Sequence, residues 1–380
     1  MKVKTIRIIG VCLLLAVWLG LVGAMWFGPS SDFSNAERRA LKQFPKLNAQ
    51  TLLDGSFMQE FDGYTQDQFP LRDSFRKIKS VFHNYVMNYK DNNNIYIQDG
   101  YAAKMEYPLN ESSLNLALIR FRGYYDTFLK NKPIKTYVAV VPDKGYYLAE
   151  ENGYLAMDYE TLFSKVRENM PWAKYIDLTQ VLSVSDYYYT DTHWRQEKIL
   201  PAAQTIAKAM NAWVPQEGDY EPKRLDKDFY GVYYGQAALP MDAEPMYWME
   251  SDVLSACKTY LCTIDETTYS PKRELLYEGV YDESKLESQD LYETYLSGAQ
   301  AVLRIENPKA KTGKELVVFR DSFGSSMVPL LVENYRTVTV VDMRYVNTNV
   351  LSRLVQFTNQ DVLFLYSTLV LNTAGSLLQQ

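Results

Sequence analysis

The sequence has very little histidine and cysteine and no excess of positive charge. Its 380 residues include only two histidines, His83 and His193, and three cysteines, of which Cys257 and Cys262 form the one close pair. A zinc site is not expected, because no second cysteine pair is present and histidine is so scarce. The net charge of −6 gives no basic surface for nucleic acid. We therefore expect no metal, no cofactor and no nucleic-acid partner, and the scarcity of histidine disfavours a metal-dependent deacetylase.

The overall composition is that of a globular chain with a large core, at 47% hydrophobic and 23% charged residues. The 31 tyrosines could line a sugar-binding cleft, although amphipathic packing at core edges is the preferred interpretation. Cys257 and Cys262 either close a small disulfide outside the cell or stay as two thiols, and their spacing leaves both alternatives open.

The N-terminus is the one long hydrophobic run. Residues 8–27 are uncharged and apolar and follow Lys2, Lys4 and Arg7. A helix of this length spans a bilayer, and the basic flank is expected to stay in the cytoplasm. Residues 23–26 are not a clean cleavage site, which favours an uncleaved signal anchor over a cleaved signal. We predict a cytoplasmic tip and anchor over residues 1–28, a polar stalk over 29–50, and an extracytoplasmic domain over 51–380.

The C-terminal part has the clearest pattern of secondary structure. Predicted strands at 315–319, 337–341 and 362–366 alternate with predicted helices at 324–335 and 349–357. This alternation indicates a parallel sheet with right-handed crossovers, in which ligands bind beyond the carboxyl ends of the strands. The fold class is therefore α/β.

The preceding residues carry weaker signals. Residues 215–300 are rich in acids, tyrosine and proline without a strong period, and we interpret them as an insertion. The other predicted elements are helices at 57–88, interrupted at 69–70, and at 114–129 and 196–213, a hairpin at 95–101, and strands at 136–141 and 301–305.

His193 is the better of the two histidine candidates for acid–base chemistry. Asp191 lies two residues away, and in an extended segment both side chains point to the same side. Asp191 could hold the Nδ1–H of the ring and leave Nε2 free as a base. His83 lies on a predicted helix with no obvious partner, so a catalytic role for it is disfavoured.

Ser322 is the candidate nucleophile. It follows the predicted strand 315–319, on the turn into a helix, where backbone N–H groups could stabilise an oxyanion. Asp321 and Ser322 are also the residue types that cap helices, which is the plainer interpretation of the pair taken alone. Together with Asp191 and His193, however, Ser322 completes a set of nucleophile, base and orienting acid.

The motifs resemble the DHHW family of Gram-positive bacteria, which is similar to the SGNH-type catalytic proteins of alginate O-acetylation. The resemblance covers most of the chain after the anchor. It rests on seven blocks in the order of the family: 68–73 (Gln-Phe-Pro-Leu-Arg-Asp), 141–144 (Val-Pro-Asp-Lys), 191–194 (Asp-Thr-His-Trp), 292–298 (Tyr-Glu-Thr-Tyr-Leu-Ser-Gly), 305–308 (Ile-Glu-Asn-Pro), 320–325 (Arg-Asp-Ser-Phe-Gly-Ser) and 341–345 (Val-Asp-Met-Arg-Tyr).

The resemblance implies an SGNH-hydrolase-like, flavodoxin-like sheet flanked by helices. It also implies roles: Ser322 as nucleophile, His193 as base and Asp191 as orienting acid. Arg344, at the end of the next strand, could bind an acyl oxygen or an anionic group of a sugar, or could form a surface salt bridge instead. The further candidates for binding substrate or oxyanion are Trp194, Lys144 and Asp321.

The chain departs from the family pattern at two positions. Thr192 stands at the second position of the motif that names the family, where the family has histidine; the mechanism does not need this position. Arg320 replaces the small glycine before Asp-Ser, which could narrow the oxyanion loop. In ordinary SGNH enzymes, separate Gly and Asn blocks complete the oxyanion hole, and neither block is identifiable in this sequence. Asn347 and Asn372 are the candidates for the Asn position, and the sequence does not choose between them.

The resemblance implies an enzyme. We expect an extracytoplasmic O-acetyltransferase or acetylesterase that acts on a cell-surface polysaccharide, and a membrane-bound O-acyltransferase is the expected partner. The alternative is an inactive SGNH-like protein that binds glycan or assembles with other envelope proteins, because Arg320 and the missing blocks could leave the oxyanion hole incomplete.

Overall fold

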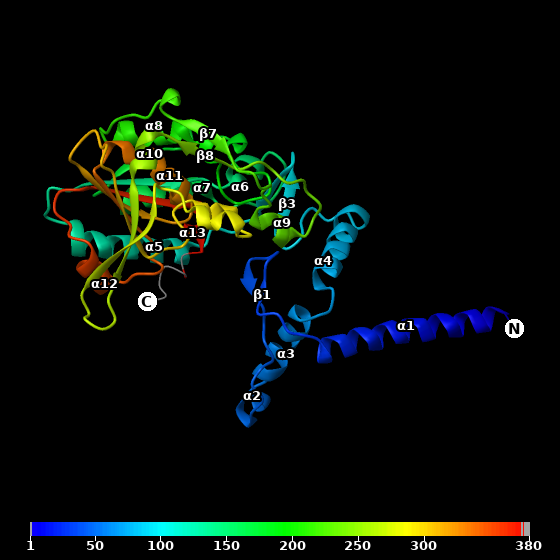
Figure 1. The fold of residues 1–380 in the computed structure, drawn as a ribbon. Helices are drawn as coiled ribbons and strands as arrows, with labels where there is room; N and C mark the ends of the chain where they lie inside the picture. Colours follow the sequence, from blue (N-terminus) through cyan, green and yellow to red (C-terminus); the bar gives the residue numbers. More distant parts are fainter. Residues whose placement is uncertain (1, 374, 376–380) are drawn as a thin grey trace. The chain divides into compact units, whose positions relative to one another are not determined.

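The computed structural model describes residues 2–373 and 375, and the chain forms two compact units (Figure 1). The first unit comprises residues 1–93 with 232–241, and the second comprises 94–231 with 242–380. Each unit is described below by itself. The predicted stalk at 29–50 and the first helices of the predicted domain both lie in the first unit, and their assignment as stalk and catalytic domain stays a prediction.

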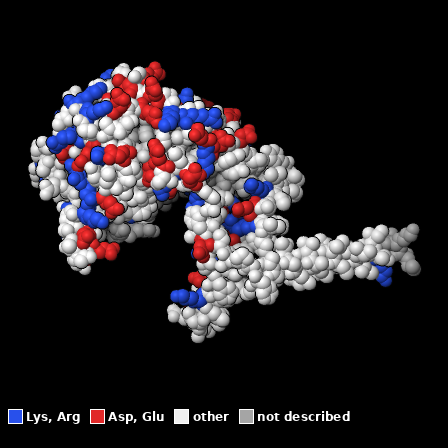
Figure 2. All heavy atoms as spheres, viewed as in Figure 1, with Lys and Arg blue, Asp and Glu red and all other residues white. Residues whose placement is uncertain are grey.

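The first unit begins with the predicted apolar helix, α1 (Lys2–Phe27). Within Lys4–Phe27 an 18-residue window has a mean hydropathy of 2.6, and the length and composition of the helix suffice to cross a membrane. Figure 2 shows the helix as a rod that, on the face in view, carries basic side chains near its N-terminal end.

The rest of the first unit consists of short elements. They are β1 (Phe33–Ser34), β2 (Arg39–Ala40), α2 (Ala49–Leu53), α3 (Ser56–Asp67), α4 (Arg72–Val81), the π-helical turn η1 (Phe82–Val86) and α9 (Val232–Ala237). The predicted helices and the interruption at 69–70 are confirmed, since α4 begins directly after Leu71, whose backbone is left-handed (φ 55°).

The second unit contains an eight-stranded sheet, in the order β10-β9-β11-β13-β12-β14-β5-β6. Five strands are parallel: β13 (Thr337–Val341), β12 (Glu315–Arg320), β14 (Asp361–Ser367), β5 (Lys135–Val141) and β6 (Lys174–Ile176). The predicted α/β class and its parallel core are thereby confirmed. Three antiparallel strands extend the sheet beyond β13: β11 (Val302–Glu306), β9 (Lys258–Ile264) and β10 (Pro271–Glu278).

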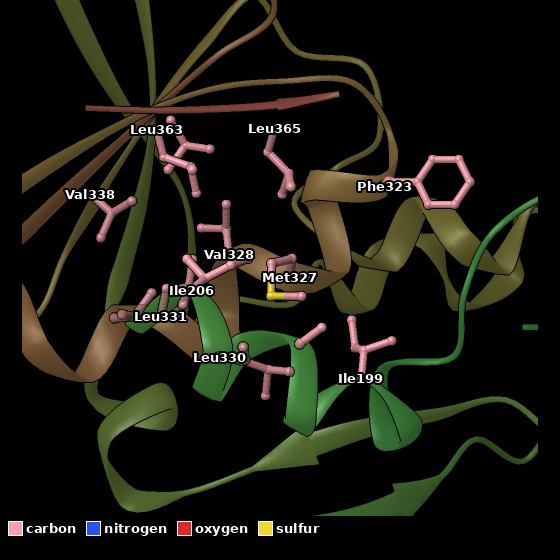
Figure 3. Packing of buried hydrophobic residues seen from close by; sticks show 14 of the residues in the cluster. Ile199, Ile206, Phe323, Met327, Val328, Leu330, Leu331, Val338, Leu363 and Leu365 are labelled. Carbon is pink, nitrogen blue, oxygen red and sulfur yellow. The ribbon is translucent and has the colours of Figure 1, made fainter. Parts of the chain in front are cut away.

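The central strands are buried on both faces, which explains their continuous β-branched and apolar sequences. Successive side chains alternate between two hydrophobic clusters, so that Leu316 and Val318 of β12 face one side and Val317 and Phe319 the other. One side is covered by α8 (Leu200–Ala209), α11 (Phe323–Met327) and η8 (Val328–Asn334), as Figure 3 shows. The other side is covered by α5 (Glu111–Tyr124), α7 (Tyr159–Asn169) and α12 (Thr348–Leu354).

Several short elements complete the second unit. The predicted hairpin is confirmed as β3 (Ile95–Gln98) and β4 (Tyr101–Lys104), with Asp99 and Gly100 at positive φ. The predicted helix 196–213 is shorter, because a 3-10 turn at Gln196–Lys198 precedes α8. The remaining elements are η2 (Tyr125–Leu129), α6 (Lys144–Leu148), η3 (Val184–Asp186), η5 (Glu217–Asp219), β7 (Glu221–Arg224), β8 (Tyr247–Glu250), α10 (Asp252–Ala256), η6 (Glu283–Glu287), η7 (Leu291–Thr294) and α13 (Thr368–Asn372).

Residues 215–300 differ most from the sequence-based interpretation. They contain β9 and β10, which belong to the main sheet, whereas residues 232–241 belong to the first unit. β10 is exposed along most of its length, carries charges and contains a bulge between Leu275 and Tyr277, so it lacks the apolar alternation of a half-buried strand. Cys257 and Cys262 are free, buried thiols in separate clusters on the two sides of the sheet, so the disulfide alternative is wrong.

Candidate active site

The candidate site lies at the carboxyl ends of the parallel strands, as this topology predicts. Ser322 stands two residues after Arg320, the last residue of β12. Asp191 and His193 come from the loop between β6 and α8, which is closed by a bridge between Tyr187 and Trp194.

The structure brings the three predicted residues into one chain of hydrogen bonds. His193 Nδ1 lies 2.6 Å from Asp191 Oδ1, and His193 Nε2 lies 2.7 Å from Ser322 Oγ. Asp191 Oδ1 also accepts the backbone N–H of His193 at 3.0 Å. Asp191 is fully buried, whereas Ser322 is partly exposed. A ring held by a carboxylate at Nδ1 presents a basic Nε2 to the hydroxyl, so this arrangement can deprotonate the serine.

Two aromatic rings fix the plane of the His193 imidazole. Tyr292 stacks on it with a centroid distance of 3.8 Å and an angle of 8°, and Phe323 contacts it at 4.9 Å. The Tyr292 hydroxyl lies 2.8 Å from Ser326 Oγ. Tyr292 belongs to one of the family blocks, but no local pattern indicated that it would contact the histidine.

Trp194 ties the histidine loop to the serine turn. Its indole N–H donates to the backbone oxygen of Phe323 at 3.1 Å and to Ser326 Oγ at 2.9 Å, and the side chain is fully buried. The structure therefore places this candidate beneath the site, where it supports the turn.

Asp321 organises the turn that carries Ser322. Its carboxylate is fully buried and accepts the N–H of Phe323 at 3.0 Å and both the N–H and the hydroxyl of Ser367 at 2.7 Å. The Ser322 side chain makes no capping bond to the helix that follows. Of the two capping candidates, only Asp321 therefore binds the turn, and the Ser322 hydroxyl faces His193.

Lys144 packs against the loop that leads to Asp191. It is buried, and its Nζ donates to the backbone oxygens of Tyr188 at 2.8 Å and Tyr189 at 3.3 Å. Burial lowers the pKa of Lys144 to about 7, against the opposing effect of the carboxylates of Asp191 and Glu244. The structure thus places this candidate against the loop that leads to Asp191.

Glu244 is a supporting residue that the sequence did not indicate. Its carboxylate accepts the N–H of Tyr189 at 2.8 Å and both the N–H and the hydroxyl of Thr190, at 2.7 and 2.6 Å. Burial raises the pKa of Glu244. Glu244 lies within residues 215–300, which show no strong hydrophobic periodicity, and it is 54 residues from Thr190 in the sequence. No local sequence pattern therefore indicated this contact.

Asp342, directly after β13, pairs with two arginines. Arg344 binds its carboxylate with two hydrogen bonds, at 2.9 Å from Nε and 2.6 Å from Nη2, and remains partly exposed. Arg320 is fully buried, lies 3.7 Å from the same carboxylate and donates to the backbone oxygen of Gly298 at 2.8 Å. Gly324 makes room for Arg320, because a Cβ at this glycine would lie 2.6 Å from the arginine Cβ.

The other candidates have separate partners. Asn347 accepts the N–H of Val350 at the start of α12, and Asn372 accepts the N–H of Asn110. His83 belongs to the first unit, where it contacts the ring of Tyr89. Within residues 2–373 and 375, no group of three or more His, Cys, Asp or Glu side chains could hold a metal ion.

Comparisons with known proteins agree with the motifs and the fold. The model of the family described as DHHW protein matches residues 156–341, which confirms the predicted resemblance. No curated protein sequence matches the chain.

Solved structures share the fold at low sequence identity. A DHHW family protein from Eubacterium siraeum is 18% identical with a TM-score of 0.59, over 76% of this chain and 95% of that one. Bacillus cereus PatB1, solved with a sulfonyl adduct, is 18% identical with a TM-score of 0.55, over 73% and 95% of the chains. The O-acetyltransferase domain of Pseudomonas putida AlgJ is 14% identical with a TM-score of 0.43, over 73% and 92%.

Proposed function

We propose that the chain is a serine-dependent O-acetyltransferase or acetylesterase that acts outside the cytoplasm on a cell-surface polysaccharide. The observation that carries the proposal is the hydrogen-bonded sequence Asp191–His193–Ser322, with contacts of 2.6 and 2.7 Å at the carboxyl end of a central strand. This position places the serine against a buried base and leaves the residue itself partly exposed.

The proposed reaction proceeds in two steps. His193 Nε2 takes the proton of Ser322 as Oγ attacks an acetyl carbonyl, and returns it to the departing alcohol when the tetrahedral intermediate collapses. A glycan hydroxyl or a water molecule then attacks the acetyl-serine; His193 takes the proton of the attacking group and returns it to Ser322 Oγ as the bond between Oγ and the acetyl carbon breaks. Asp191 stabilises the imidazolium that forms in each step.

The backbone N–H of Ser322 is the first donor for the oxyanion. The N–H groups of Phe323, Gly324 and Ser325 already donate to acceptors within the turn. In the part of the chain that the structure describes, the Ser322 N–H has no hydrogen-bond acceptor. Arg344 is the candidate for a second donor, since Asp342 binds only two of its five N–H groups.

The proposed location outside the cytoplasm depends on the role of α1. If α1 is an uncleaved signal anchor, its basic N-terminal flank stays inside and the second unit lies outside the cytoplasm. A membrane-bound O-acyltransferase would then supply the acetyl group across the bilayer. Such a partner would favour transfer over hydrolysis, because it would supply an acetyl donor for the glycan.

Hydrolysis of p-nitrophenyl acetate or of an acetylated glycan by the full chain tests the proposal. We expect turnover in the wild type and its loss in Ser322→Ala and His193→Ala. Ser325→Ala is the matched control, since this buried hydroxyl three residues on has no hydrogen-bond partner among the described residues. Equal turnover in the wild type and in Ser322→Ala would remove the serine from the mechanism.

The alternative is an inactive protein that binds glycan or an assembly partner. Arg320 was one ground for it, but in the structure this side chain is held by Gly298 and Asp342. A sulfonyl fluoride distinguishes the two functions, since it labels a serine only where the hydroxyl is activated. A chain that binds polysaccharide but is never labelled at Ser322 would favour the alternative.

A further inference from the structure

The helix formed by α4 and η1 is amphipathic, but its apolar face points outward and its polar face points into the first unit. Its outward face carries a row of apolar side chains at helical spacing, continued by the residues that flank it. Their exposed fractions are 70% for Leu71, 43% for Phe75, 65% for Ile78, 50% for Phe82, 69% for Tyr85, 65% for Val86 and 51% for Tyr89. A helix of a soluble protein normally buries such a face, and a continuous exposed apolar surface marks a binding surface.

The polar face of the same helix points into the first unit. Arg72 pairs with Glu37 at 2.5 Å, Arg76 donates to the backbone oxygen of Gly235 at 2.8 Å, and Ser80 donates to that of Ala237 at 2.9 Å. These contacts fix the rotation of the helix about its axis. The apolar row therefore faces outward because the polar row is bound.

The apolar row is continuous with the hydrophobic helix α1 inside the first unit. In one groove of about 1020 Å³, Leu21 and Met25 from the last turns of α1 lie with Phe69 and Phe75 at the start of α4, beside polar and basic side chains that include Arg72, Arg76 and Lys79. Trp26 lies beside Phe61 of α3 at 6.2 Å, at the end of the same helix. Aromatic residues at the end of a membrane span are typical of the interface between lipid and water.

The charges beside the row suit a lipid surface. Lys77 and Lys79 lie on α4, both exposed, while Asp73 is its only acidic residue. Long basic side chains can lay their carbon chains along an apolar surface and direct their charge toward lipid phosphates.

We propose that the outward face of residues 71–89 lies in the outer leaflet of the bilayer that α1 spans, with lipid acyl chains against the exposed apolar row. The inference rests on α1 being a membrane anchor and is independent of the triad. The anchor would then end in a second membrane contact that fixes the first unit at the surface.

Depth-dependent quenching tests the proposal with the full chain in vesicles of phosphatidylethanolamine and phosphatidylglycerol. A polarity-sensitive fluorophore is attached to a cysteine at Ile78 or Phe82, in a Cys12→Ser background whose other cysteines are buried. We expect a blue-shifted emission and a loss of intensity when the vesicles contain lipids with spin labels on their acyl chains.

Two further labels make the result decisive. Ile119→Cys on α5 is the matched control, since this isoleucine is 67% exposed against 65% for Ile78, and its label should be neither shifted nor quenched. A label on the native Cys12 in α1 reports insertion of the anchor. Quenching at Cys12 but not at Ile78 would overturn the docking and keep the anchor, whereas no quenching at Cys12 would overturn both.

Two other outcomes would also overturn the proposal. A blue shift at Ile78 without quenching would mean that protein covers the face. Equal quenching at Ile78 and Ile119 would mean that the contact is not specific to the apolar row. In either case, cross-linking from the same cysteine would identify the protein or lipid that covers it.

Discussion

Gly231→Ala is expected to disable the site without replacing any of its three proposed catalytic residues. Gly231 packs directly against the backbone of Asp191: a Cβ at this glycine would lie 2.3 Å from both the Cα and the Cβ of Asp191 and 2.4 Å from its nitrogen. The Gly231 N–H also donates to Thr190 Oγ1 at 2.8 Å, which fixes the two segments together.

The size of the effect follows from these distances. Carbon atoms in ordinary contact are about 3.5 Å apart, so the two backbones would have to separate by about 1.2 Å. A displacement of this size would take the 2.6 Å contact between Asp191 and His193 beyond hydrogen-bond distance. A misplacement of about 1 Å can cost roughly 100-fold in rate, equivalent to about 2.7 kcal/mol. The overpacking itself should lower the free energy of unfolding by about 1–3 kcal/mol.

The assay is the kcat for p-nitrophenyl acetate together with the thermal midpoint of the same preparation. Gly123→Ala on α5 is the matched control, because no atom lies within 4 Å of the added Cβ; in a helix this change should stabilise by about 0.5–1 kcal/mol and leave kcat unchanged. A folded Gly231→Ala variant with the wild-type kcat would refute the reasoning.

Three further predictions concern other parts of the chain. Tyr292→Phe should cost about 1 kcal/mol of stability and keep activity, because the ring stack survives, whereas Tyr292→Leu should lower kcat about 10- to 100-fold by releasing the His193 ring; steady-state kinetics separate the two. Lys144→Met should lower the free energy of unfolding in urea by about 1–3 kcal/mol, since it leaves the buried backbone oxygens of Tyr188 and Tyr189 without their donor. Hydrogen bonding by Arg39 lowers the pKa of Asp67 from 3.8 to about 2. Because the folded state has the lower pKa, about 2 kcal/mol of stability is lost as the pH falls from about 4 to 2. Asp67→Asn should remove this pH dependence from unfolding curves measured over that range.

The central sheet could be predicted from the sequence because its strands are buried on both faces. Such strands are continuous apolar, β-branched runs such as 337–341, and the helices between them reveal the parallel direction. The position of Ser322 followed from the end of one such strand. The pairing of Asp191 with His193 followed from a spacing of two residues.

The supporting residues could not be predicted, because their contacts join distant segments. Gly231 and Glu244 bear on the loop before His193, and Tyr292 bears on its ring, yet none carries a local pattern that indicates its partner. Arg320 was expected to narrow the oxyanion loop, but it lies in the interior because Asp342 and Gly298 bind it there. Sequence patterns thus predicted the proposed reacting groups, and only the fold showed which residues contact them.

The outer edge of the sheet has a consequence for how copies of the chain behave near one another. An unpaired edge strand offers free backbone groups to any neighbouring sheet, and such edges lead to aggregation unless they are blocked. At this edge β10 is exposed, carries Lys272, Arg273 and Glu274, and is bulged between Leu275 and Tyr277. Charge and bulge together oppose strand addition by a second copy. The same charges that removed the apolar alternation from the sequence of β10 therefore disfavour aggregation through this edge of the sheet.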